Sequence, residues 1–141
     1  MKRFEGKAVL VTGGAGSIGW ATAQRLSAEG ARVVLADLNG ERAAELSATL
    51  DGIGVGADVA EEAGARAAVE AVLEAFGQLD VVFNNAGISG PVSPVHEISP
   101  DDWDHVIRTN LRSQFLVLRL AARAMIAGGR PGAIVNMGSS M

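Results

Sequence analysis

The sequence contains no cysteine and no tyrosine, and aromatic residues make up only 4% of its 141 residues. Without cysteine the chain can form no disulfide, no reactive thiolate and no cysteine-based metal site. It also has no cluster of lysine and arginine, and its net charge of −4 argues against a nucleic-acid-binding surface. No apolar run is long enough to span a bilayer. We therefore expect a chain that binds neither nucleic acid nor membranes.

The composition and the first residues indicate a globular protein of the cytoplasm. Hydrophobic residues make up 48% of the chain and charged residues 20%, which is typical of a folded domain. A chain of 141 residues can bury one hydrophobic core, so we expect a single domain over residues 1–141. Residues 1–7 (MKRFEGK) become polar where a signal peptide would be apolar, which favours a cytoplasmic location.

The chain is organised around a glycine-rich stretch, residues 9–20 (VLVTGGAGSIGW), in which an apolar strand runs through a turn into a helix. So many glycines indicate a turn where Cβ atoms would clash or where φ is positive. A helix that begins in such a turn presents free backbone N–H groups and the positive end of its dipole, which suits a phosphate. The hypothesis is a dinucleotide pyrophosphate site; the alternative is an ordinary glycine-rich turn.

Hydrophobic patterns predict alternating strands and helices. Strands are expected at 7–12, 32–36, 53–57, 79–83 and 133–137, where apolar runs are bounded by glycine or polar residues. Helices are expected at 17–29, 41–50, 61–76 and 100–127, the last capped by Ser99 and stopped by Gly128 and Gly129. This alternation predicts an α/β fold with a doubly wound parallel sheet, whose ligands bind at the carboxyl ends of the strands.

Asp37 stands at the end of the second predicted strand. In a dinucleotide-binding fold a carboxylate at this place accepts hydrogen bonds from the adenosine ribose hydroxyls. Neither Leu38 nor Asn39 offers a positive charge for a 2′-phosphate, so the pattern favours NAD over NADP. The alternative is an aspartate that only caps the following helix.

Several motifs in order resemble the N-terminal, cofactor-binding part of a classical short-chain dehydrogenase/reductase. They are TGGAGSIG at 12–19, Asp58-Val59, NNAG at 84–87, Asn110 and IVNMGS at 134–139. The resemblance runs across essentially the whole chain. It implies a Rossmann-type, three-layer α/β/α fold, an NAD cofactor, and hydride transfer between the nicotinamide and a small-molecule alcohol or ketone. It also implies a homo-oligomer in the full-length form.

The resemblance assigns a role to each matching residue. Gly13 and Gly19 match glycines of the cofactor turn, Ile18 lies against the pyrophosphate, and Ser17 stands where the family usually has glycine. Two further groups are assigned by the same resemblance: Asp58 and Val59 flank the adenine, and Asn85, Ala86 and Gly87 line the nicotinamide side. A tight turn is the alternative for Asn84 and Asn85, since asparagine tolerates the left-handed conformation.

Two residues are the catalytic candidates. By its register from Asn136, Ser139 matches the family's catalytic serine; the adjacent Ser140 is less favoured, and a turn serine is the alternative for both. Asn110 falls within an apolar stripe of the long predicted helix, so we expect its amide to be buried and partnered. The stripe consists of Trp103, Val106, Ile107, Leu111, Gln114 and Leu118. The resemblance gives Asn110 a part in holding a proton-relay water.

The resemblance also shows what this sequence does not contain. The family places its acid/base tyrosine and a lysine on the helix after the fifth strand, and this chain ends at Met141 without any tyrosine. We therefore expect a sheet truncated after the fifth strand and a chain that is inactive alone. A non-catalytic dinucleotide-binding module is the alternative function. His96 and His105 have no metal-site spacing, so no metal is expected.

Overall fold

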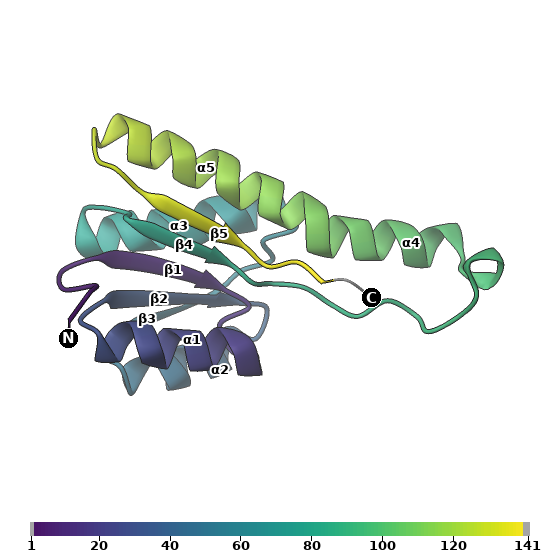
Figure 1. The fold of residues 1–141 in the computed structure, drawn as a ribbon, viewed down its shortest axis with the longest axis horizontal. Helices are drawn as coiled ribbons and strands as arrows, with labels where there is room; N and C mark the ends of the chain where they lie inside the picture. The colour runs from purple at the N-terminus through teal and green to yellow at the C-terminus, as the bar shows by residue number, and fades with distance from the viewer. Residues whose placement is uncertain (1, 140–141) are drawn as a thin grey trace.

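The computed structural model describes residues 2–139, which form one five-stranded parallel sheet flanked by helices (Figure 1). The strands are β1 (Ala8–Thr12), β2 (Arg32–Asp37), β3 (Ile53–Gly56), β4 (Val81–Asn84) and β5 (Ala133–Asn136). The α-helices are α1 (Ser17–Ala28), α2 (Gly40–Ala48), α3 (Glu62–Phe76), α4 (Pro100–Ile107) and α5 (Ser113–Ala127). A 3-10 turn, η1 (Val95–Glu97), precedes α4, and a π-helical segment, η2 (Arg108–Arg112), joins α4 to α5. The predicted strands and helices are confirmed within a few residues.

The sheet order is β3-β2-β1-β4-β5, with every pair parallel. Central strand β1 is apolar along its length, and none of its five residues is exposed, because strands flank it and helices cover it on both faces. The strand order reverses between β1 and β4, which neighbour each other in space but not in sequence. In doubly wound sheets this switch point, at the carboxyl ends of the strands, is where ligands bind.

The two faces of the sheet carry separate cores, which confirms the predicted three-layer α/β/α arrangement. Leu10 and Val34 point to the face covered by α3 and α5, and Val9 and Leu35 point to the face covered by α1 and α2. This division follows from the alternation of side chains along each strand. Figure 1 shows both helix layers, and also shows α4 extending past the strand ends.

The glycines of β3 allow helix α2 to pack closely against this strand. The sequence shows them as interruptions of a weak strand, but a Cβ built on Gly54 would lie 2.2 Å from the backbone nitrogen of Ala44 in α2. A Cβ on Gly40 would lie 2.7 Å from the Cα of Gly56. Helix α2 therefore lies directly on the backbone of β3, and this contact admits only glycine.

The long predicted helix differs from expectation in its centre. Ser99 caps α4 by accepting a 3.0 Å hydrogen bond from the N–H of Asp102, and α5 ends at Ala127 before Gly128, as predicted. Between them η2 has π-helical bonding, which changes the angular register of all that follows. The predicted apolar stripe is wrong: Trp103, in the helix α4 that extends past the strand ends, and Leu111 are 59% and 61% exposed. The buried face consists instead of Ser113, Leu116, Val117, Leu120, Ala121 and Met125.

Among the described residues, no helix is both long enough and apolar enough to cross a membrane.

Candidate functional site

The glycine turn after β1 is shaped by close backbone contacts. Gly13 has φ +62°, and a Cβ there would lie 2.9 Å from the Cα of Ala86. A Cβ on Gly19, in the first turn of α1, would lie 2.3 Å from the carbonyl oxygen of Gly13. Both glycines are thus required for the turn to fold back on itself and against the end of β4. Gly19 is buried, which agrees with its close contact with the carbonyl group of Gly13.

Helix α1 begins at Ser17, with Gly16 as its N-cap and no side chain capping it. The first N–H groups of a helix have no partner within the helix, and together with the helix dipole they form a site for an anion. Ser17 and Ile18 are both exposed here. Ile18 lines a cleft together with Asn85 and Ala86, whereas Ser17 lines a groove on the outer side of α1 with Arg25.

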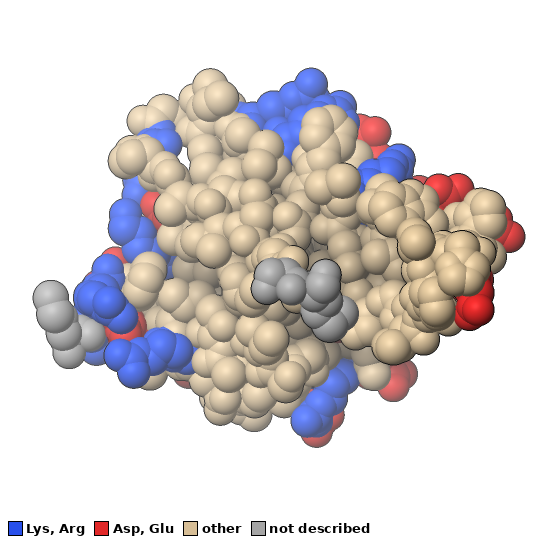
Figure 2. Space-filling model, turned by 45° about the vertical axis from the view of Figure 1, so that its right-hand side comes forward, with Lys and Arg blue, Asp and Glu red and all other residues tan. Residues whose placement is uncertain are grey.

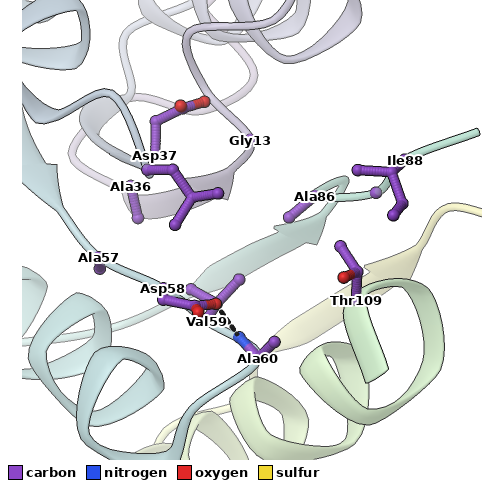
Figure 3. Close-up of a pocket in the computed structure, with 12 residues that line it drawn as sticks. Gly13, Ala36, Asp37, Ala57, Asp58, Val59, Ala60, Ala86, Ile88 and Thr109 are labelled. Carbon is purple, nitrogen blue, oxygen red and sulfur yellow. Dashed lines mark hydrogen bonds between the residues drawn. The ribbon is translucent and has the colours of Figure 1, made fainter. Parts of the chain in front are cut away.

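A first cleft, of about 130 Å³, lies at the carboxyl ends of β1 and β2 (Figure 3). It is named the adenosine-side cleft after the part of the cofactor that the sequence motifs lead us to expect there. Asp37 comes from the end of β2, Asp58 and Val59 follow β3, and Thr109 faces them from η2. The full lining is Gly13, Ala36, Asp37, Leu38, Ala57, Asp58, Val59, Ala60, Ala86, Gly87, Ile88 and Thr109. Six predicted cofactor residues from four separate motifs therefore lie around one cavity, namely Gly13, Asp37, Asp58, Val59, Ala86 and Gly87.

Asp37 joins the end of β2 to the glycine turn. One carboxylate oxygen accepts a 3.0 Å hydrogen bond from the N–H of Ala15, and the other accepts a 2.9 Å bond from the N–H of Asn39. The N-cap of α2 is Asn39, whose side chain accepts from Arg42. The capping alternative for Asp37 is therefore wrong. Its carboxylate lines the cleft, and each oxygen can accept a further hydrogen bond.

Thr12 is a site residue whose role sequence reasoning missed. Its hydroxyl is buried and accepts hydrogen bonds from the N–H groups of Asn85, at 3.0 Å, and Ala86, at 3.1 Å. The Asn85 amide in turn donates to the carbonyls of Thr12 and Gly13, both at 3.2 Å. Only Asp51 among the described non-glycine residues has positive φ, so the left-handed-turn alternative for Asn84 and Asn85 is wrong. A polar residue ending an otherwise apolar strand was the available signal.

A second cleft, of about 580 Å³, continues from the first. It is named the nicotinamide-side cleft after the part of the cofactor that the sequence motifs lead us to expect there. Ala86, Gly87 and Ile88 line both clefts, so the two share a wall after β4. The remaining lining is Ile18, Asn85, Ser89, Asn110, Leu111, Gln114, Met137, Gly138 and Ser139. The second cleft thus brings both catalytic candidates to the wall formed by NNAG.

Asn110 is held by the chain segment after β4. Its amide oxygen accepts from the N–H of Ile88 and its amide nitrogen donates to the carbonyl of Ile88, both at 2.8 Å. A Cβ on Gly87 would lie 3.2 Å from the Asn110 oxygen, so glycine allows this approach. The side chain is half-buried rather than buried, and it is partnered as expected. Its place in η2 aims it at the cleft; π-helical segments occur often at functional sites.

Ser139 is exposed and lines the nicotinamide-side cleft just beyond the end of β5. Strand β5 is fixed there by Asn84, whose amide donates a 2.9 Å hydrogen bond to the side chain of Asn136. Gln114 donates a 2.7 Å bond to the carbonyl of Met137 and lines the same cleft. Sequence reasoning placed Gln114 only in an apolar stripe. Ser140 lies outside the described residues.

The arrangement defines a class of protein: a doubly wound α/β domain with a cleft that crosses the carboxyl ends of the central strands at the switch point. The sequence matches the family model of the short chain dehydrogenases over residues 7–141. The chain belongs to this family of oxidoreductases.

Known relatives agree with this assignment. D-threitol dehydrogenase of Mycolicibacterium smegmatis is 41% identical over 142 residues, covering 97% of this chain and 54% of the relative. The crystal structure of an NAD+-bound xylitol dehydrogenase has a TM-score of 0.92 and 38% identity, covering 98% of this chain and 55% of that one. Levodione reductase has a TM-score of 0.91 and 39% identity, covering 97% and 55%. The chain spans about half the length of each of these three relatives.

Proposed function

We propose that this chain binds NAD(H) and forms the cofactor-binding part of an oxidoreductase that interconverts a small alcohol and its ketone. The observation that carries the proposal is the shared wall of the two clefts, residues 86–88. This wall connects Asp37 and Asp58 at one end with Asn110 and Ser139 at the other. A xylitol dehydrogenase of similar fold has been solved with NAD+ bound, which supports a nicotinamide cofactor.

The residues present fit such a cofactor. The turn at Gly13 lies against Ala86 with no room for a Cβ, and the N-terminus of α1 opens beside it, as a pyrophosphate requires. Asp37 would accept hydrogen bonds from the adenosine ribose, and Asp58 and Val59 would flank the adenine. Asn85, Ala86 and Gly87 would line the nicotinamide side, with Ile18 against the pyrophosphate. Gly19 would support the turn, and Ser17 would donate a hydrogen bond to a phosphate.

When bound, the nicotinamide would supply the hydride chemistry, and the protein would supply orientation. Ser139 would hydrogen-bond the oxygen of the substrate, because its exposed hydroxyl opens into the nicotinamide-side cleft. Asn110 would hold the wall after β4 through both backbone groups of Ile88, and would support a water for proton relay. These residues position and orient, but none is a strong general acid at neutral pH.

A non-catalytic dinucleotide-binding module is the second candidate, favoured by one observation: none of the described residues that line the nicotinamide-side cleft carries a carboxylate, an imidazole or an amine. Both candidates require cofactor binding, so binding is tested first. We expect calorimetric titration to give saturable NAD(H) binding that AMP competes for. Gly13→Val, whose side chain would meet Ala86, should abolish it, whereas Ala67→Val, at an exposed position of α3 that lines neither cleft, should not. Unsaturable NAD(H) binding by the unaltered, folded chain would contradict both candidates.

A further inference from the structure

Two arginines of η2 reach across to the loop that follows β3, residues 57–61. The Arg108 guanidinium bonds the carboxylate of Glu61 and lies 3.8 Å from an oxygen of Asp58. Arg112 donates to the carbonyl of Ala60. These contacts join segments about fifty residues apart in the chain. The same segment, η2, also supplies Asn110 and Thr109 to the two clefts.

The loop is held from its other side by the first turn of α3. A Cβ on Gly64 would lie 2.0 Å from the carbonyl oxygen of Asp58, so this helix turn touches the loop backbone directly. Within the loop, the Asp58 side chain accepts a 3.0 Å hydrogen bond from the N–H of Ala60. The Asp58 carbonyl accepts another, also of 3.0 Å, from the N–H of Glu61. The loop therefore lies between α3 and η2.

Arg108 also lies beside the Asp58 carboxylate. One Asp58 oxygen is occupied by the N–H of Ala60, and the other is the one nearest the guanidinium. Asp58 and Glu61 are two carboxylates within one short loop, and Arg108 is near both, which offsets their repulsion. The hydrogen bond from Arg108 is the main reason that the pKa of Glu61 lies below its ordinary value.

We propose that Arg108 is a positioning residue for the adenine end of the cofactor, acting by holding Asp58 and the 57–61 loop against η2. The inference rests on the proposed function, because the adenosine-side cleft must bind adenosine for the position of Asp58 to matter. It also makes η2 a physical link between the two ends of the cofactor site. Arg108 contacts the 57–61 loop, and Asn110, two residues later, lines the nicotinamide-side cleft.

The test compares Arg108→Met, which keeps the length of the side chain and removes its charge, with Arg119→Met. Arg119 is the matched control because it pairs from α5 with Glu62 of α3 at 3.4 Å but lines neither cleft. We expect Arg108→Met to raise the Kd for AMP about fivefold, the scale of one partly exposed ion pair. The Kd for NAD+ should rise by the same factor, since both ligands carry the adenosine. Arg119→Met should change neither Kd by more than about twofold.

Hydrogen exchange without ligand tests the positioning step by itself. The N–H groups of Ala60 and Glu61 should exchange faster in Arg108→Met than in the unaltered chain, and Arg108→Lys should restore part of the protection. The inference is overturned if AMP binds Arg108→Met as tightly as it binds the unaltered chain, or if both methionine variants weaken AMP equally. If the unaltered chain binds neither AMP nor NAD+, both the proposed function and the role of Arg108 are wrong. If exchange at Ala60 is unchanged while NAD+ still binds, only the role of Arg108 fails.

Discussion

The carboxylate of Asp37 accepts a 3.0 Å hydrogen bond from the backbone N–H of Ala15, and so connects β2 to the glycine turn that follows β1. The contact gives the aspartate two functions that a sequence motif does not separate. Its carboxylate supports the turn by accepting a hydrogen bond from the N–H of Ala15, and it places a negative charge in the adenosine-side cleft. A substitution that changes one function and keeps the other can measure each.

The charge of Asp37 should determine the choice between cofactors. We expect NAD(H) to bind more tightly than NADP(H) by about 1–3 kcal/mol. In NADP(H) a 2′-phosphate replaces the ribose hydroxyl, so the hydrogen bond from this hydroxyl to Asp37 is lost and two negative charges face each other. Asp37→Asn keeps an oxygen acceptor for Ala15 and removes the charge, so it should reduce the preference about tenfold. Calorimetric titration with both cofactors measures it. The control is Asp104→Asn, which makes the same carboxylate-to-carboxamide substitution at an exposed residue of α4 that lines neither cleft. Equal affinities in the unaltered chain would contradict the ribose role.

The 141-residue chain should show no steady turnover of NADH with simple ketones or secondary alcohols. Ser139 and Asn110 line the nicotinamide-side cleft, but the chain has no tyrosine to act as general acid or base. A positioned acid or base typically contributes about 10²–10⁴-fold to the rate. The loss of NADH absorbance measures the turnover. Robust turnover that Ser139→Ala abolishes, and that Ser27→Ala in α1 does not, would show that another residue acts as the acid.

The ion pairs that the buried Glu29 makes with two exposed arginines should give a specific acid sensitivity. Glu29, at the end of α1, bonds Arg3 and Arg25, and the hydrogen bond from Arg3 is the first of the causes that lower its pKa to about 2. A carboxyl with a lowered pKa stabilises the fold above its ordinary pKa, and this contribution is lost as the pH falls towards 2. Glu29→Gln should therefore lower the Tm at pH 7.

The difference in Tm between the unaltered chain and Glu29→Gln should shrink between about pH 4.5 and pH 2. Thermal melts across this range measure it. Glu45→Gln is the control, because Glu45 pairs with Arg42 on the exposed face of α2. An exposed pair contributes at most about 1 kcal/mol, so this variant should melt close to the unaltered chain. A Glu29→Gln difference that stays the same at pH 3 and pH 7 would contradict the ion-pair explanation.

The parts of the fold that local patterns determine could be predicted from the sequence. An apolar run such as 8–11 predicts a strand buried on both faces, and the glycines after Ala127 stop a helix, because both signals act within a few residues. From the sequence, Gly54 is only an interruption of a strand. Glycine is needed at this position because the backbone of α2 lies against it, and no local sequence pattern contains that contact.

The site was predicted where its residues belong to motifs and missed where it depends on packing. Asp37 and Asn85 were identified, whereas the bracing hydroxyl of Thr12 was not, because its partners are backbone groups of a distant strand. The apolar stripe around Asn110 was wrong for two reasons. Helix α5 is apolar on several sides, and the π-helical bonding of η2 shifts the register between Trp103 and the buried Leu116.

The apolar face of η2 and α5 should make the chain self-associate. Leu111, Phe115 and Leu118 recur at helical spacing, and they are 61%, 58% and 37% exposed. Val135 of β5, the strand at one edge of the described sheet, is 53% exposed. Figure 2 shows one face of the molecule, on which lysine, arginine, aspartate and glutamate lie mostly towards the margins; the tan area between them includes uncharged polar residues as well as apolar ones. Apolar surfaces of this kind favour contact with another chain.

Light scattering and a thermal melt should show an associated or only marginally stable 141-residue chain. Phe115→Glu places a charge in the centre of the apolar face, so it should shift the population towards monomer, with an association constant at least about tenfold lower. Val92→Glu is the matched control, because Val92 is fully exposed in the loop before α4 and stands apart from this face. If the unaltered chain is a clean monomer with one sharp unfolding transition, the apolar face is not an interface. The chain is then a self-sufficient domain, which favours the non-catalytic binding module over the incomplete enzyme.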